Sequence, residues 1–136
     1  MKRNDISFGN SNERKVLEYL NNNNSDMYHK TKGRFCYYDF YNTTHIAELK
    51  SRRNAHNTYP TTMVSQSKID KSIVDNKKIV FYFLFTDGLY LYTYNPEDKL
   101  EYKKGGRNDR SKKEINNYCY IPIKLLELIT ESIKSI

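Results

Sequence analysis

The sequence predicts an α/β or α+β fold, in which a mixed sheet carries helices on its faces. Segments rich in β-branched and aromatic residues, which favour strands, recur along the chain. Between them lie segments whose apolar residues recur three and four positions apart, as in amphipathic helices. The expected order is helix, two strands, helix, three strands, helix. A chain of 136 residues provides for a single domain over residues 1–136.

The first half of the chain predicts a helix and a hairpin. Residues 12–20 carry a narrow apolar stripe behind serine and asparagine residues that can cap a helix. Residues 1–10 have no comparable pattern and are expected to be flexible. Residues 34–41 and 45–52 are predicted strands, and residues 42–44 between them are short enough for a hairpin turn.

The middle of the chain predicts a helix followed by a second hairpin. Residues 61–75 start with threonines that can cap a helix. Residues 78–86 are almost continuously apolar, as expected of a central strand buried on both faces. The Asp-Gly pair at 87–88 is a strong hairpin-turn signal, and residues 89–95 return as a strand.

The last third predicts a loop, a short strand and a helix. Residues 96–117 are polar and charged and contain a Gly-Gly pair, so a long basic loop is expected. Residues 118–121 are a predicted strand. Pro122 can occupy the first turn of a C-terminal helix over residues 123–134, whose apolar stripe is a candidate homodimer interface.

Composition narrows the function classes. The net charge of +7 fits a nucleic-acid partner, but lysine outnumbers arginine 16 to 7, as expected of AT-rich codons, so charge alone does not decide. The chain has no apolar run of about 18 residues and no hydrophobic N-terminal segment. A protein that is neither secreted nor membrane-bound, and therefore intracellular, is expected.

Asp39, Glu48 and Lys50 form the most informative pattern in the chain. Alternate residues of a strand share a face, so Glu48 and Lys50 point the same way. A two-residue hairpin turn places Asp39 on that face, at a backbone diagonal of roughly 7–8 Å from Glu48. A four-residue turn places Asp39 directly opposite Glu48, again on the same face.

Such a pair of carboxylates predicts a metal site. Two carboxylates this close repel each other unless a cation lies between them, and Mg²⁺ is the natural occupant. A bound Mg²⁺ can activate a water molecule and neutralise charge on a phosphodiester. Lys50 could position that water or stabilise the transition state. The alternative is a surface salt bridge between Glu48 and Lys50.

These residues resemble the PD-(D/E)xK nuclease superfamily, in which an acid on one strand precedes Glu/Asp-x-Lys on the next strand and a helix follows. More narrowly, the arginine pair after Lys50, the stretch from Tyr59 to Val64 and Lys68 look like small viral and phage endonucleases, including VRR-NUC-like and Holliday-junction-resolvase-like members. The resemblance implies a restriction-endonuclease-like core. It also implies a Mg²⁺-dependent DNA endonuclease, with Mn²⁺ able to substitute, that hydrolyses phosphodiester bonds with metal-activated water, acts on branched DNA inside a host cell, and forms a homodimer.

The resemblance also assigns roles to residues. Asp39 and Glu48 would hold the metal together with the Leu49 carbonyl, and Lys50 would be the catalytic lysine. Glu13 matches an acid that serves as a further metal ligand in many members. Its alternative role is to interact with the helix dipole in the first turn of the predicted helix.

The helix that follows the metal site would supply one more polar catalytic residue, either Gln66 or Lys68. Helical geometry places Gln66 on the sheet-facing side, whereas the motif match favours Lys68, which would also contact DNA. Arg52 and Arg53 would contact phosphates that flank the scissile one. Two rival functions are a non-catalytic nucleic-acid-binding protein and a structural protein in which Asp39, Glu48 and Lys50 do not converge.

Overall fold

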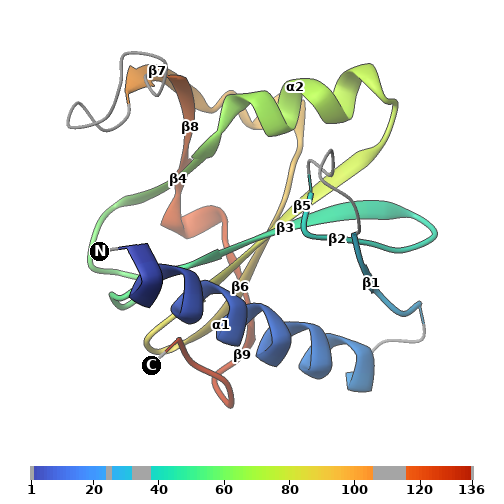
Figure 1. The fold of residues 1–136 in the computed structure, drawn as a ribbon. Helices are drawn as coiled ribbons and strands as arrows, with labels where there is room; N and C mark the ends of the chain where they lie inside the picture. Colours follow the sequence, from blue (N-terminus) through green and yellow to red (C-terminus); the bar gives the residue numbers. More distant parts are fainter. Residues whose placement is uncertain (1, 24–25, 32–37, 106–115, 136) are drawn as a thin grey trace.

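The computed structural model describes residues 2–23, 26–31, 38–105 and 116–135, with side chains over 8–23, 26–31, 38–104 and 117–135. This part of the chain forms a larger and a smaller sheet together with two α-helices (Figure 1). The fold class is confirmed: helices and a mixed sheet build an α/β core of the restriction-endonuclease type. Neither helix, as far as the chain is described, combines the length and apolarity needed to cross a membrane.

The larger sheet has the strand order β1-β2-β3-β5-β6-β9. Strands β3 and β5 are parallel because β4 and α2 form the connection between them, and the other neighbours are antiparallel. The bounds are β1 (His29–Lys30), β2 (Phe40–Tyr41), β3 (His45–Ser51), β5 (Lys78–Phe85), β6 (Gly88–Thr93) and β9 (Glu127–Thr130).

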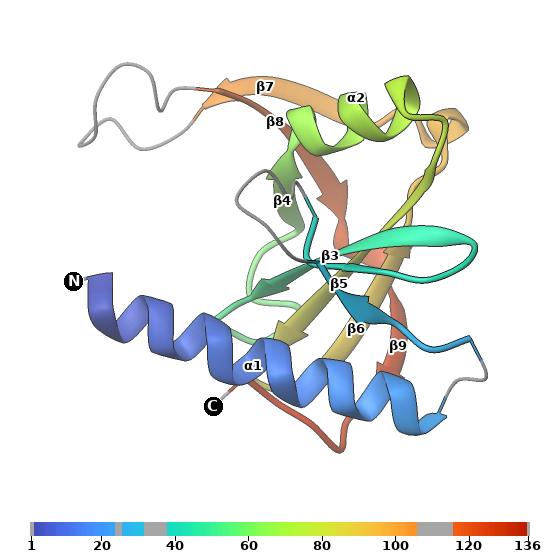
Figure 2. The same ribbon diagram turned by 45° about the vertical axis from the view of Figure 1, so that its right-hand side comes forward.

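The smaller sheet has the order β4-β8-β7 and packs with α2 above the larger sheet, while α1 crosses the opposite face (Figures 1 and 2). Short 3₁₀ turns precede β7 and β9. The bounds are α1 (Lys2–Asn23), β4 (Thr61–Ser65), α2 (Gln66–Val74), η1 (Pro96–Asp98), β7 (Glu101–Gly105), β8 (Asn116–Pro122) and η3 (Ile123–Leu125).

Strand β5 contributes side chains to a buried cluster on each face of the larger sheet. Its residues after Lys78 are all buried, as predicted for a central strand. Alternate side chains of a strand point to opposite faces. Phe81 and Phe83 therefore pack with Ile69 of α2 and with the small sheet. Val80 lies in the second cluster, which contains Val16 of α1.

The prediction of one helix over residues 61–75 is wrong in its first part. Residues 61–65 form β4, paired with β8, and the helix begins only at Gln66. Burial alternates along β4, with Thr62 and Val64 buried and Met63 exposed, which is a strand period. The threonines Thr61 and Thr62 are the first residues of β4 and do not cap α2.

The N-terminal helix is longer than predicted. Residues 2–10, expected to be flexible, belong to α1, which continues to Asn23. The apolar stripe of residues 12–20 is confirmed, because Val16 and Leu20 are buried against the sheet. Of the predicted strand over residues 34–41, Phe40–Tyr41 form β2 and residues 38–39 do not belong to a strand, while residues 34–37 lie outside the described part of the chain.

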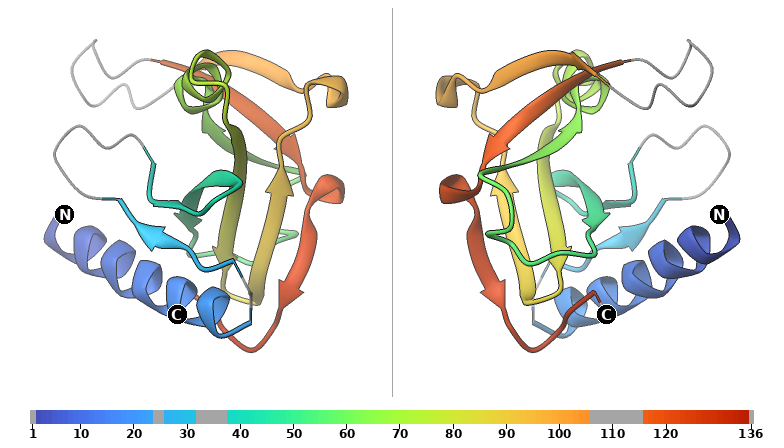
Figure 3. Two further views of the ribbon diagram at one scale, coloured as in Figure 1. Left: turned by 90° about the vertical axis from the view of Figure 1, so that its right-hand side faces the viewer. Right: turned by 90° about the vertical axis from the view of Figure 1, so that its left-hand side faces the viewer.

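The C-terminal helix predicted over residues 123–134 is absent. The chain makes the turn η3 and then β9, which pairs with β6, so the proposed dimer interface on a helix is lost as well. Residues 127–130 form a strand because the edge of β6 offers backbone hydrogen bonds that a helix could not use. The end of the chain then runs beside α1 (Figure 3), where Lys15 Nζ donates to the Lys134 carbonyl at 2.8 Å.

The long loop predicted over residues 96–117 is partly wrong. Residues 101–105 form β7, which pairs with β8, and residues 106–115 lie outside the described ranges. The strand predicted at residues 118–121 is confirmed within β8.

The second hairpin is confirmed with its turn shifted by one residue. Phe85 pairs with Gly88, so the turn residues are Thr86 and Asp87. Gly88 has a φ of 154°, and a Cβ atom there would lie 2.8 Å from the Thr130 carbonyl oxygen of β9.

Replacing Gly88 with alanine is therefore expected to lower the free energy of unfolding by about 2 kcal/mol. Chemical denaturation measures this loss. Gly9→Ala is the matched control, because a Cβ atom there meets nothing within 4 Å in the middle of α1. That change is expected to stabilise the protein by about 0.5–1 kcal/mol. Equal effects of the two substitutions would contradict the close approach at Gly88.

Candidate active site

The first hairpin brings Asp39 beside Ala47 and Glu48 of β3. Phe40 pairs with Ala47, and the Asp39 N–H donates to the Ala47 carbonyl at 3.1 Å. Of the two turn lengths consistent with the sequence, the hairpin therefore has the four-residue connection, closed by Asn42 and His45. Asp39 thus lies just before the first residue of β2, beside the part of β3 that extends beyond the β2 pairing.

The Asp39 side chain replaces the missing strand partner of β3. Strand β2 pairs with β3 only as far as Ala47, which leaves the next outward-facing N–H of β3 without a strand neighbour. Asp39 Oδ2 accepts a hydrogen bond from the Leu49 N–H at 2.8 Å. A charged acceptor makes this bond stronger than a neutral one, so the carboxylate is held in place by the backbone.

Glu48 is a buried carboxylate between two lysines. Its exposure is only 4%, and its Oε2 lies 3.9 Å from Lys50 Nζ and 3.4 Å from Lys68 Nζ. Burial, followed by the nearby charge of Asp39, raises the pKa of Glu48 to about 7, against the opposing pull of Lys50 and Lys68. Its Oε1 has no hydrogen-bond partner in the described part of the structure.

Helix α2 brings Lys68, and not Gln66, to Glu48. The helical geometry that favoured Gln66 assumed a helix from residue 61, whereas Gln66 is the first residue of α2. Lys68 extends from the first turn toward Glu48, with Nζ also 5.8 Å from the centre of the Tyr38 ring. The two lysines reach the same carboxylate oxygen from different layers of the fold.

Glu13 lines a hollow of about 570 Å³, which is also lined by Asp39, Leu49 and Lys50. Because α1 begins at Lys2, Glu13 is in the middle of the helix, and its alternative role in a first turn is excluded. Glu13 pairs with Lys30 of β1 at 3.0 Å. Sequence reasoning missed Lys30 because a two-residue strand leaves no periodic pattern.

A comparison with protein families now adds to this geometry. Residues 9–129 match the model of a family described as "Phage putative PDDEXK endonuclease". The chain belongs to this family. The membership confirms the PD-(D/E)xK resemblance and makes the protein a nuclease of phage type, with DNA as the substrate of its family. No curated protein and no solved structure matches the chain.

In this phage PDDEXK endonuclease the carboxylates fit the divalent metal that such nucleases typically use. Glu48 Oε1 is a buried acceptor without a hydrogen-bond partner in the described residues, and Glu48 is close enough to Asp39 for the Asp39 charge to raise its pKa. The described ranges contain no group of three or more His, Cys, Asp and Glu side chains arranged for a metal. Mg²⁺ needs only one or two carboxylates, together with waters and substrate phosphates, so this pair is a sufficient donor set.

Arg52 and Arg53 of the endonuclease line the hollow just beyond Lys50. Arg52 also joins three strands, because its N–H donates to the Leu84 carbonyl at 2.9 Å and its Nη2 to the Met63 carbonyl at 2.8 Å. The Arg53 guanidinium lies 4.0 Å from the centre of the Phe8 ring on α1. Phosphate contacts by both arginines stay a prediction.

Proposed function

We propose that the protein is a Mg²⁺-dependent DNA endonuclease in which Asp39, Glu48 and the Leu49 carbonyl hold the metal and Lys50 is the catalytic lysine. Mn²⁺ is expected to substitute for Mg²⁺. The observation that carries the proposal is the buried Oε1 of Glu48, which has no partner among the described groups. Leaving a buried carboxylate oxygen unpaired is costly, and a bound cation removes that cost.

Each residue then has a distinct task at the site. Bound Mg²⁺ would supply a water molecule of lowered pKa and neutralise charge on the phosphodiester. The Leu49 N–H orients Asp39 by donating to Oδ2, and the carboxylate would bind the metal from this position. Lys50 and Lys68 keep positive charge at Glu48 Oε2, where they can stabilise the negative charge that develops on the phosphate.

Three further groups extend the proposal. Glu13 is a further metal ligand once a divalent ion replaces its contact with Lys30. Arg52 and Arg53 bind the phosphates next to the scissile one, at the rim of the same hollow. Branched DNA is the preferred substrate, and two copies of the chain would cut its two strands.

The test is cleavage of supercoiled plasmid, linear duplex and four-way branched DNA, each with Mg²⁺, with Mn²⁺ and with a chelator. We expect cutting with either metal, none with the chelator, and the highest rate on branched DNA. Asp39→Asn is expected to lower the rate by at least about 10³-fold, since it removes a metal ligand and leaves a side chain of the same shape. Analytical ultracentrifugation of the complex reports the number of copies.

The outcomes separate the proposal from its rival. DNA binding without cutting under every metal condition would identify a non-catalytic DNA-binding protein. Cutting that survives both the chelator and Asp39→Asn would place the chemistry elsewhere. Equal rates on the three DNAs would remove the preference for branched DNA and leave the metal-dependent nuclease in place.

A further inference from the structure

A second cavity opens on the far side of Arg52 from the carboxylates. Its volume is about 390 Å³, at the small end of the roughly 300–1,000 Å³ typical of small-molecule sites. Aromatic side chains from separate parts of the chain line it, namely His56, Tyr59, Phe85 and Tyr120. Neither the metal site nor the lysines at Glu48 use any of these rings, so the cavity has no role in the function proposed above.

His56 is fixed as a rigid wall of this cavity. The ring Nδ1 of His56 is 2.6 Å from Asp87 Oδ2, and the backbone N–H of His56 donates to Asp87 Oδ1 at 3.0 Å. The His56 ring also stacks on Tyr90, with centroids 4.6 Å apart and planes inclined by 18°. Since Asp87 engages Nδ1, Nε2 is the ring nitrogen that stays available for a ligand.

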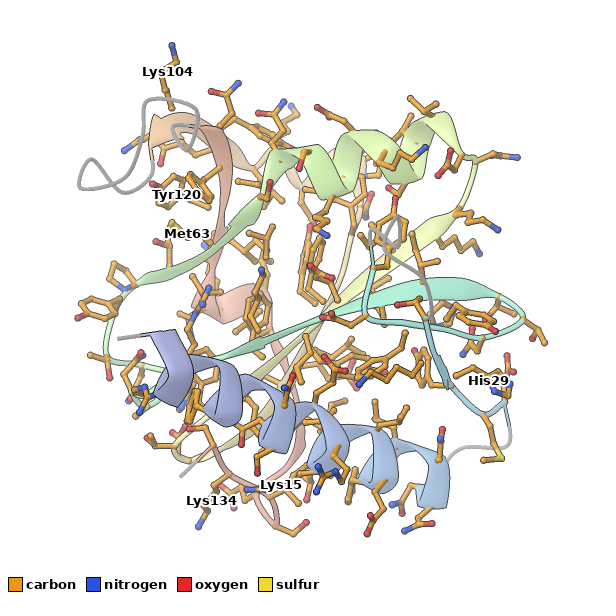
Figure 4. All side chains as sticks on the ribbon, in the orientation of Figure 1. Lys15, His29, Met63, Lys104, Tyr120 and Lys134 are labelled. Carbon is orange, nitrogen blue, oxygen red and sulfur yellow. The ribbon has the colours of Figure 1, made fainter. Side chains whose placement is uncertain are left out.

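Another part of the cavity lining comes from the smaller sheet. Met63 of β4 pairs with Tyr120 of β8, and the two side chains lie next to each other (Figure 4). Tyr59, just before β4, is 63% exposed although its ring belongs to the cavity lining. A tyrosine that stays largely in solvent beside an apolar cavity has most of its face available for stacking.

Arg52 connects the cavity to the candidate active site, because it lines both the cavity and the hollow that contains Asp39 and Lys50. Arg52 follows Lys50 by two residues, which on an extended chain corresponds to about 7 Å. A phosphate at Lys50 would therefore lie close to a residue that also lines the cavity. Aromatic faces and a guanidinium plane are the groups on which proteins stack unpaired bases.

We propose that this cavity binds one unpaired base of the DNA strand whose phosphodiester lies at Asp39 and Glu48. The inference rests on the proposed nuclease function and adds a preference for DNA with an unstacked base close to the cut. Paired bases are held in the duplex stack, and extruding one costs a few kcal/mol, whereas a base at a bulge or branch point is already available.

The experiment measures binding, so that it is separate from cleavage. The full chain carrying Lys50→Ala is titrated, with Mg²⁺ present, into a duplex with a single bulged 2-aminopurine and into the same duplex with the 2-aminopurine paired. Gel electrophoresis checks that the DNA stays intact. We expect quenching of the bulged 2-aminopurine by stacking, and tighter binding of the bulged DNA than of the paired DNA.

Tyr59→Ala, added to Lys50→Ala, tests the cavity itself. Because the change removes a ring on which the base would stack, it is expected to weaken binding of the bulged DNA about tenfold and to abolish the quenching. Binding of the paired DNA is expected to stay within twofold. Tyr41→Ala is the matched control, because Tyr41 is 45% exposed and its ring packs against His29, outside this cavity.

Three results would overturn the inference. They are unchanged 2-aminopurine fluorescence on binding, equal loss of affinity for both DNAs in Tyr59→Ala, and self-association of the protein that Tyr59→Ala abolishes, which would assign the cavity to a second copy of the chain. Cleavage by the unmodified chain is scored separately. A nuclease without base quenching refutes only the cavity, and quenching without cleavage refutes only the nuclease.

Discussion

Replacing Lys50 with methionine is expected to lower the rate of DNA cleavage by about 10³-fold while the protein stays folded. Methionine keeps the apolar stem and removes the charge. Lys50 shares the strand and the face of Glu48, with Nζ 3.9 Å from Oε2. Loss of a positioned charge that acts in the transition state typically costs about 10²–10³-fold. Single-turnover cleavage at saturating DNA measures the chemical step without product release.

Lys68→Met is the informative comparison. Lys68 lies closer to the same oxygen, at 3.4 Å, but comes from α2, so Lys50 still provides one charge when Lys68 is removed. We expect a loss of about tenfold. Lys71→Met is the matched control on the same helix, where Lys71 forms a surface ion pair with Asp75. Its rate is expected to stay within twofold of the unmodified protein.

The order of these three rates decides between the lysines. A larger loss for Lys68→Met than for Lys50→Met would make Lys68 the catalytic lysine and reduce Lys50 to a counter-charge of Glu48. Similar losses for all three variants would indicate a general effect of positive charge on DNA binding, which a parallel binding titration would detect.

The second large effect is a dependence of the free energy of unfolding on pH in the metal-free protein. The pKa of Glu48 is raised from 4.5 to about 7 in the fold, first by burial and then by Asp39. Between these values the folded state binds a proton that the unfolded state releases, so the free energy of unfolding falls as pH rises. Each pKa unit corresponds to about 1.4 kcal/mol, which gives a total loss of about 3 kcal/mol from this group.

Chemical unfolding in a chelator at several pH values between 4.5 and 7.5 measures this fall. Glu48→Gln is expected to remove it, because an amide does not titrate. Glu101→Gln is the control, since Glu101 is exposed and paired with Lys103 only at the surface. A pH dependence that is the same in Glu48→Gln and in the unmodified protein would show that Glu48 is not the buried titrating group.

Sequence reasoning located the strand that carries the candidate site residues but not the layer above it. The shared face of Glu48 and Lys50 followed from the two-residue period of β3, which depends only on local geometry. The continuous apolar run of β5 likewise marked a strand covered on both sides. These two strands form the parallel pair at the centre of the larger sheet.

The misread segments depend on partners that are distant in the sequence. Residues 61–65 form a strand because β8 pairs with them, and residues 127–130 form one because β6 has an open edge. The one-residue shift of the Asp-Gly turn has a similar origin, since Gly88 must approach β9 closely. Short apolar runs fit either a helix or a strand by periodicity, so tertiary contacts made the choice.

The charged groups around Glu48 come from different elements, because Lys50 lies on β3 and Lys68 on α2, and this has a consequence for how the protein folds. Asp39 and Glu48 meet through a hairpin that closes within ten residues, which is a fast local event. Lys68 arrives only when β3 and β5 pair in parallel across the whole β4–α2 connection, a slower step because a long loop must close first. The acidic pair thus forms before one of its two lysines, and the last contact to form completes the charge balance of the site.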